Sequence, residues 1–296
     1  MTDDLFFVFV MISILGYGIH VPLIALFARR FDSLIVTVYR NLSLGIFILP
    51  LLYFVPFSEI AAIKGHLLTL VIAAVTGFIS FMWTLNGMRY LPIGVSNSIV
   101  RTFNVIFAIM LGALFFGEYL SPLQLLLLVG ILAVAVALAL SRSQHAHLDV
   151  RNMGRGSMFS VFAGIGASVS FFFFSILSRE LNPLVAAYFW ETSIGVCALL
   201  YLLFHLARGR YQGAVLLPIR QASAIVGASF FVVVGTGGMA FAFNHGPYSL
   251  ASGLGTTIIL VTTLISWFLF KEKLGRLQIG LIILAVLLMF LLKVFS

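Results

Sequence analysis

The sequence predicts an all-α polytopic membrane protein with ten transmembrane helices arranged as an inverted five-plus-five repeat. Three observations lead to this fold class: the composition, the spacing of the apolar segments and an internal duplication. Of the 296 residues, 62% are hydrophobic and only 9% are charged, and the mean hydropathy is +1.17. Soluble domains carry about 25% charged residues. A water-soluble protein is therefore excluded, because this chain has too few polar groups to cover a soluble surface.

The apolar segments are each long enough to cross a bilayer core, which takes about 20 residues of α-helix. The run that starts at Leu5 is expected to be a first span and not a cleaved signal peptide, because no positively charged leader precedes it. The ten expected spans are 5–27, 34–55, 67–88, 92–116, 121–141, 157–178, 184–206, 222–244, 248–270 and 275–295.

The two groups of five spans resemble each other in sequence. Adding 150 to the number of a residue in the first group matches glycine to glycine and arginine to arginine at several positions, and an offset of 154 matches a Glu-x-Leu-x-x-Leu-Gln segment at the end of spans 4 and 9. The matched pairs are Gly16 and Gly166, Arg29 and Arg179, Gly45 and Gly195, and Glu118 and Glu272. We therefore expect two repeats, residues 1–148 and 149–296.

An odd number of spans in each repeat requires the repeats to have opposite orientations in the membrane. The loops after the odd-numbered spans hold twelve Lys and Arg residues and the other loops hold three. Because basic loops stay in the cytoplasm, we expect a multi-pass protein of the inner (cytoplasmic) membrane with both termini outside. Inverted repeats are typical of secondary transporters, which bind their cargo near the bilayer midplane.

The junctions after spans 4 and 9 are similar to a motif of a known family. The segments Phe116–Gln124 and Phe270–Gln278 resemble the GE-x-L-x-x-x-Q junction of EamA-type transporters, which belong to the drug/metabolite transporter superfamily. The resemblance covers nearly the whole chain in length, span number and duplication. It implies a ten-helix basket with a central cavity lined mainly by spans 1, 3, 4, 6, 8 and 9. The family moves diverse metabolites and drugs, so the resemblance does not identify the cargo.

Arg101 is the most informative polar residue inside a predicted span. It lies about ten residues into span 4, and Asn97 and Asn104 share its helical face. A charge at this depth needs a partner or a wet cavity. We expect Arg101 to bind a substrate carboxylate or phosphate. A structural ion pair or a capped helix carbonyl is the alternative interpretation.

Glu191 is the acidic residue that lies well inside a span, about seven residues into span 7. It is expected either to carry a coupled proton or to form a structural or gating pair. Arg40 has a matching depth in span 2, but the inversion of the repeats argues against a direct Arg40–Glu191 pair. Arg40 is expected to extend toward the cytoplasmic interface, and it is also a candidate, with Glu191, for proton coupling or gating.

Further polar and aromatic residues complete the predicted substrate site. Tyr17 and His20 lie on a polar stripe of span 1, where a hydrogen-bonded neutral imidazole is the simpler interpretation of the histidine. Trp83 and Asn86 in span 3 are expected at the cavity wall, and Trp190 is expected to contribute a further aromatic surface. Phe171 to Phe174 are expected to face lipid or pack between helices. Glu118 and Glu272 are expected to stabilise the N-termini of the helices that follow them.

Several functional classes lack support in the sequence. No phosphate-binding loop, HExxH segment or nucleophile elbow is present, so we expect a protein that is not an enzyme and needs no cofactor. His145 and His147 in the central linker are too few for a metal site. The basic residues are scattered, which argues against a nucleic-acid partner. The expected partners are a small-molecule substrate, the lipid bilayer and, as a candidate coupling ion, the proton; two fused repeats can close a cavity as a monomer.

We therefore expect a secondary transporter that moves a small amphipathic metabolite by alternating access. An amino acid is the leading cargo and export the expected direction, with import left open by the sequence alone. An organic cation or a vitamin-like molecule bound by Glu191 and aromatic residues is the alternative cargo. A membrane enzyme acting on lipid-linked groups is the alternative of another class.

Overall fold

A computed structural model describes residues 2–143, 150–211, 213–270 and 275–295 of the chain. These residues form helices connected by short turns, and no strand occurs among them. Nine of the helical segments are long and apolar enough to cross a membrane, and the segment Pro122–Leu138 is a shorter apolar helix. The predicted polytopic all-α fold is confirmed, with a helix at each of the ten predicted positions.

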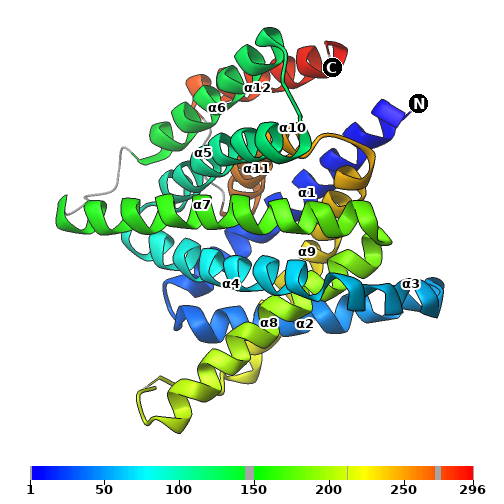
Figure 1. Cartoon of the computed structure of the whole chain (residues 1–296). Helices are drawn as coiled ribbons and strands as arrows, with labels where there is room; N and C mark the ends of the chain where they lie inside the picture. Colours follow the sequence, from blue (N-terminus) through cyan, green and yellow to red (C-terminus); the bar gives the residue numbers. More distant parts are fainter. Residues whose placement is uncertain (1, 144–149, 212, 271–274, 296) are drawn as a thin grey trace.

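The first repeat contains five spans and a short helical excursion between the second and the third (Figure 1). Asp32 precedes the second span, and its side chain accepts a hydrogen bond from the Leu34 amide, which satisfies one free donor of the helix N-terminus. The elements are α1 (Thr2–Ala28), α2 (Ser33–Ile48) with η1 (Leu49–Phe54), α3 (Phe57–Ala61), η2 (Ala62–His66), α4 (Leu67–Tyr90), α5 (Ile93–Leu111) with η3 (Gly112–Phe116), and α6 (Pro122–Ser143).

The second repeat follows the same plan without the excursion. Asn182 takes the place of Asp32, and its side chain accepts from the Leu184 amide at the start of the second helix. The fourth span is divided by a short 3-10 turn. The elements are α7 (Val150–Glu180), α8 (Pro183–Ala207), α9 (Ile219–His245), α10 (Tyr248–Leu254) with η4 (Gly255–Thr257) and α11 (Ile258–Phe270), and α12 (Arg276–Val294).

The contacts between the repeats are reciprocal. The first helix of each repeat packs on the third helix of the other, which gives the α1–α9 and α4–α7 pairs. The second, fourth and fifth helices pack on their own counterparts, as α2–α8, α5–α10 and α6–α12. This exchange is the pattern that a two-fold axis between the repeats produces, so the duplication seen in the sequence is also present in the packing.

Two matched glycines lie at the α2–α8 crossing, where the repeats meet on this axis. A Cβ atom at Gly45 would lie 2.7 Å from Thr192 Oγ1, and a Cβ atom at Gly195 would lie 3.0 Å from the backbone nitrogen of Leu42. Thr192 and Leu42 are themselves separated by 150 residues. The missing side chains therefore let the second helices of the two repeats approach closely.

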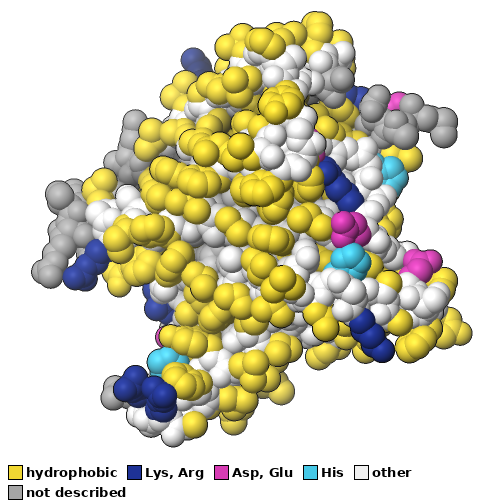
Figure 2. Space-filling model, viewed as in Figure 1, with side chains coloured by type: hydrophobic (Ala, Val, Ile, Leu, Met, Phe, Trp, Pro, Cys, Tyr) yellow, Lys and Arg dark blue, Asp and Glu magenta, His cyan; other side chains and the backbone are white. Residues whose placement is uncertain are grey.

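The helices run between two opposite faces of the molecule. Asp4 near the start of α1 and Lys293 near the end of α12 form an ion pair of 3.0 Å, which defines the terminal face. The other end, where Arg29 directly follows the last residue of α1, is called the Arg29 face. Hydrophobic side chains cover the middle of the view in Figure 2, and charged side chains lie toward its left and right margins, as expected for a protein surrounded by lipid.

Candidate functional site

A partly open cavity lies between the helices, in the half nearer the Arg29 face, and encloses about 830 Å³ of empty space when the part open to solvent is included. Residues from α1, α2, α4, α5, α7 and α8 line it. Seven of the nine residues predicted for substrate binding or coupling are among the lining residues: Tyr17, His20, Arg40, Asn97, Arg101, Trp190 and Glu191. The topology thus brings together side chains that are separated by up to 174 residues in the sequence (17 to 191).

The helices that line this cavity differ from those implied by the family resemblance. The second helix of each repeat contributes to the wall, whereas α9, α10 and α11 contribute no lining residue. The reason is close packing, since a Cβ atom at Gly16 of α1 would lie 2.6 Å from the Phe231 carbonyl oxygen of α9. With α9 held directly against α1, no space remains between these two helices at that level.

Trp83 and Asn86 do not line the cavity, in contrast to the prediction. The Trp83 ring packs against Phe162 of α7, with ring centroids 5.5 Å apart. The Asn86 side chain accepts a hydrogen bond of 2.9 Å from Ser33 at the start of α2. The cavity face of α4 is instead formed by residues such as Ser80 and Thr84. The rotation of α4 about its axis thus turns Trp83 away from the cavity.

Arg40 and Glu191 form a direct ion pair, so the expectation that they lie apart was wrong. The distance between Arg40 Nη1 and Glu191 Oε2 is 3.1 Å, and both side chains are buried. Arg40 is the eighth residue of α2 and Glu191 the ninth of α8, which places each about 12–14 Å along its helix. Half of a bilayer core is about 15 Å. Inversion exchanges the two faces but leaves a residue near the midplane close to its original depth.

The Arg40 side chain therefore points into the protein and not toward an interface. Its guanidinium carbon lies 4.5 Å from the centroid of the Phe81 ring, in a cation–π arrangement. Together with the ion pair to Glu191, this contact offsets the cost of removing the guanidinium from water.

The Glu191 carboxylate accepts three hydrogen bonds, from side chains of two other helices. Oε2 accepts from Arg40 Nη1 at 3.1 Å and from Asn41 Nδ2 at 2.9 Å, both on α2. Oε1 accepts from the Thr236 hydroxyl of α9 at 2.6 Å. Because the Thr236 proton is directed to Glu191, the Tyr17 hydroxyl is the donor in its 2.8 Å contact with Thr236. The network joins α1, α2, α8 and α9.

The guanidinium group of Arg101 is placed differently. Arg101 and Asn97 lie one turn apart on α5 and both face the cavity. Within the described part of the chain, Arg101 has no ion-pair partner and makes no hydrogen bond, and its Nε atom is buried. Arg40 and Arg101 against Glu191 give the cavity two cations and one anion. The site therefore has an excess positive charge located at Arg101.

His20 has a defined orientation in the wall of the cavity. Its Nδ1 atom lies 3.0 Å from the Ala228 carbonyl oxygen of α9. A carbonyl oxygen can only accept, so Nδ1 carries the hydrogen. The side chain is 3% exposed, and its Nε2 atom has no hydrogen-bond partner in the described structure.

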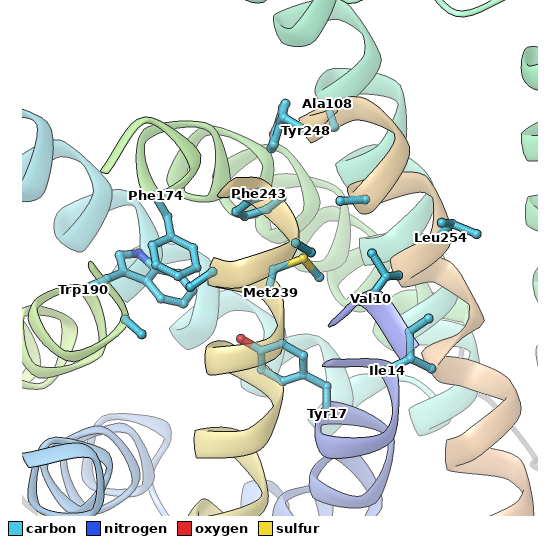
Figure 3. Close-up of a cluster of buried hydrophobic side chains, with 14 of the residues drawn as sticks. Val10, Ile14, Tyr17, Ala108, Phe174, Trp190, Met239, Phe243, Tyr248 and Leu254 are labelled. Carbon is cyan, nitrogen blue, oxygen red and sulfur yellow. The ribbon is translucent and has the colours of Figure 1, made fainter. Parts of the chain in front are cut away.

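An aromatic cluster of Phe171, Phe174, Trp190 and Phe243 adjoins the cavity, and Phe171 and Trp190 also line it. Figure 3 labels Phe174, Trp190 and Phe243. The Trp190 and Phe174 rings are stacked, with centroids 4.2 Å apart and planes at 11°. Phe171 contacts Trp190, and Phe243 contacts Phe174. Subtracting the repeat offsets of 150 and 155 from Phe171, Phe174, Trp190 and Phe243 gives Val21, Ile24, Arg40 and Met88. All four of these counterparts line the cavity.

Glu118 lies at the terminal face and connects the repeats. Its carboxylate is 2.6 Å from Arg179 Nη2, and it accepts from the backbone amides of Tyr248 and Ser249 at 2.9 Å each. It therefore stabilises the N-terminus of α10 in the other repeat. The prediction that Glu118 stabilises the helix that follows it was wrong. Burial raises the pKa of the Glu118 carboxyl, but the hydrogen bonds from Arg179, Ser249 and Tyr248 outweigh burial and leave its pKa lowered.

The counterpart Glu272 lies outside the described residues, as do His145 and His147 of the central linker. Among the described residues, no group of three or more His, Cys, Asp and Glu side chains could hold a metal ion.

Sequence reasoning missed Asn41 and Thr236 as partners of Glu191. A signal for Asn41 was present, because the offset of 150 that relates the repeats converts 41 into 191. Residues related by the axis at a helix crossing are expected to meet. Thr236 had no comparable signal, since threonine is common in membrane helices and its neighbours depend on how α9 is rotated.

Comparison with known proteins agrees with this architecture. The model of the EamA-like transporter family matches residues 5–140 and 154–293. No curated protein matches the sequence. Among 28 matching chains of solved structures, one titled "Crystal structure of protein" superposes with a TM-score of 0.73 at 15% identity and covers 97% of this chain and 96% of its own. At that identity the likeness shows the fold alone.

Proposed function

The chain belongs to the EamA-like transporter family, and on that premise we propose that it is a secondary transporter for a small amphipathic metabolite with a carboxylate group. An amino acid with a large apolar side chain is the leading cargo. The proposed mechanism is alternating access, with the cargo held near the midplane where the repeats meet. Membership in this family makes the chain a membrane transporter of the drug/metabolite transporter superfamily; cargo and mechanism are the proposal.

The observation that carries the proposal is the guanidinium of Arg101, which has no partner among the described residues and lies in a cavity with an excess positive charge. A cation at membrane depth is costly unless an anion or water compensates it. A carboxylate presents two oxygens in the geometry of a guanidinium, and the resulting pair is strong in a low-dielectric site. Asn97 lies next to Arg101 in the cavity wall, and its unpaired Nδ2 atom offers a further donor.

The remaining wall of the cavity supports an apolar portion of the cargo. Val21, Ile24 and Leu85 contribute aliphatic surface, and Phe171 and Trp190 contribute aromatic surface. Small-molecule sites are commonly apolar cavities with a few placed polar groups. An amino acid with a large side chain combines the two features that this cavity would recognise.

An organic cation is less well supported, because the acid that it would need is already occupied. Glu191 accepts from Arg40, Asn41 and Thr236. To bind a cationic cargo, Glu191 would have to give up its ion pair with Arg40. We propose that Arg40 and Glu191 act as a gating pair that holds α2 and α8 together. A proton on Glu191 would weaken the same pair, so proton coupling would act through it.

We propose that the protein lies in the inner (cytoplasmic) membrane with both termini outside. The excess of Lys and Arg in the odd-numbered loops supports this orientation. The Arg29 face would then be cytoplasmic, and the cavity lies in that half of the bundle. Cargo loading from the cytoplasm fits an exporter.

Counterflow in sealed liposomes tests the proposal. Purified protein would be reconstituted and assayed for exchange of labelled amino acids, with a pool of organic cations assayed in parallel. We expect amino-acid exchange in the wild type, loss of at least 90% of it in Arg101→Ala, and partial activity in Arg101→Lys, which keeps the charge without the bidentate geometry. Normal exchange by Arg101→Ala, or exchange of cations alone, would refute the carboxylate site.

A further inference from the structure

The cavity is lined by side chains with unpaired polar atoms of two kinds. The donors are Arg40 Nε, Asn97 Nδ2 and Arg101 Nε, and the acceptor is His20 Nε2. All four residues line the same cavity. Buried polar atoms are normally hydrogen-bonded, so this group of unpaired atoms indicates where a ligand would supply the missing partners. A ligand that satisfies these atoms must carry hydrogen-bond acceptors for the three donors and a hydrogen-bond donor for the acceptor.

The acceptor character of His20 follows from its contact with α9. Since Nδ1 donates its hydrogen to the Ala228 carbonyl at 3.0 Å, Nε2 of the neutral ring carries a lone pair. No carboxylate pairs with His20 among the described residues. An unpaired Nε2 lone pair in this wall can therefore accept an N–H or O–H group.

Glu191 is not available for that purpose. Each of its carboxylate oxygens already accepts a hydrogen bond, and the Arg40 guanidinium neutralises its charge. An ammonium group that entered the cavity would find a stronger acceptor in Glu191 only by displacing Arg40. His20 Nε2 requires no such exchange.

We propose that His20 is a specificity-determining residue whose Nε2 atom accepts a hydrogen bond from an N–H or O–H group of the cargo, while Arg101 binds the carboxylate. The inference rests on the proposed function and narrows its substrate class. The cargo is a carboxylate that also carries a hydrogen-bond donor, and an α-ammonium group meets this requirement. Simple fatty or aryl carboxylates that lack the donor leave Nε2 unpaired and bind more weakly.

Matched pairs of probes separate the two ends of the cargo. L-Phenylalanine and 3-phenylpropionate share the carboxylate and the ring, and L-leucine and 4-methylpentanoate share the carboxylate and the aliphatic chain, but only the amino acids carry the donor. The measured quantity is the ratio of the concentrations at which the two members of a pair inhibit counterflow by half, together with the shift in Tm that each causes in purified protein.

The wild type should prefer the amino acid over its deaminated analogue by about tenfold or more, because the analogue leaves the buried Nε2 acceptor without a donor. His20→Leu should bring this ratio close to one, mainly by weakening the amino acid. His20→Gln, which keeps an acceptor oxygen, should retain part of the preference. His245→Leu is the matched control, since it makes the same chemical change at the terminal face, outside the cavity, and should leave the ratio unchanged.

The outcomes distinguish this inference from the function on which it rests. If both members of each pair bind the wild type equally, or if His20→Leu keeps the wild-type ratio, the role of His20 is refuted while the carboxylate site at Arg101 stands. If neither member of either pair binds the wild type, the carboxylate site and the role of His20 are both refuted.

Discussion

Arg40 and Glu191 form a buried ion pair, 3.1 Å long, at the crossing of α2 and α8. The pair lies on the approximate two-fold axis between the repeats, yet it is asymmetric, because Arg40 has Trp190 as its counterpart and Glu191 has Asn41. All four residues belong to the same crossing. The two repeats therefore differ in sequence at the crossing where they meet, since the first contributes Arg40 to the ion pair and the second contributes Glu191.

Removal of one member of this pair should be more harmful than removal of both. Glu191→Ala or Arg40→Ala leaves an uncompensated buried charge, which costs about 3–5 kcal/mol. The double variant Arg40→Met with Glu191→Met should recover much of the lost stability, since apolar residues of similar size replace a buried pair at little cost. Thermal unfolding in detergent measures this. Additive losses in the double variant would contradict a direct coupling between the two side chains.

A methyl group at Gly16 should disrupt the α1–α9 contact. The added Cβ atom would meet the Phe231 carbonyl oxygen at 2.6 Å, and backbone cannot move aside as a side chain can. Gly237→Ala on α9 is the matched control, because no atom lies within 4 Å of its Cβ position. We expect a large drop in Tm for Gly16→Ala and, for Gly237→Ala, a gain of about 0.5–1 kcal/mol from helix propensity. Equal Tm values would argue against this helix contact.

The crossing of α2 and α8 offers a steric rescue experiment. Gly45→Ala places a Cβ atom 2.7 Å from Thr192 Oγ1, and Thr192 Cβ is 3.5 Å away. We expect Gly45→Ala to lower the Tm and Thr192→Ala, introduced together with it, to restore most of the loss. Thr192→Ala alone serves as the reference for the double variant. A double variant no more stable than Gly45→Ala would mean that another contact limits this crossing.

Glu118 should make stability at the terminal face depend on pH. Its pKa is lowered in the folded protein from the ordinary value of 4.5. The stabilisation is therefore fully present above that value and is lost as the pH falls through the lowered folded pKa. Below pH 4.5 the Tm of the wild type should fall toward that of Glu118→Gln. A constant difference in Tm between the two proteins from pH 7 to pH 3 would contradict this account.

The aromatic cluster and the cavity should differ in access to solvent-borne reagents. After Cys197, the one native cysteine, is replaced by serine, a cysteine at Ile24 should react with a polar maleimide, because position 24 lines the cavity. A cysteine at the counterpart position, Phe174, should react slowly. Trp190→Ala, which removes the stacked ring, should speed labelling at position 174. Equal labelling of both positions without this change would contradict the packing of the cluster.

The fold was largely predictable from the sequence, and the site only in part. The positions of the spans and the duplication can be read directly along the sequence. A run of about 20 apolar residues predicts a membrane-spanning helix, and glycines matched at a constant offset indicate a repeat. The depth of Arg101 and of Glu191 was read from the same pattern. The sequence alone did not define the rotation of α4 about its axis, which directs Ser80 and Thr84 to the cavity and Trp83 to Phe162.

The Arg40–Glu191 pair was missed for a different reason. The predicted depths were adequate, but the inversion was interpreted as a separation of the two residues to opposite faces. Arg40 and Glu191 are so close to the midplane that inversion does not separate them. The two-fold axis between the repeats instead brings them together at the α2–α8 crossing. Glu118 shows the same limitation, since its partner helix α10 belongs to the other repeat.

The aromatic cluster also bears on the balance between the two states of the proposed alternating-access cycle. The present arrangement contains stacked pairs such as Trp190 on Phe174, each worth about 0.5–1.5 kcal/mol beyond its buried area. The counterparts Arg40 and Ile24 cannot form such pairs in the alternate state. Under the proposed alternating access, the empty carrier would therefore favour the state in which its site faces one compartment. Cargo arriving from the other compartment meets a small competent fraction and, in proportion to that fraction, a higher apparent Kd.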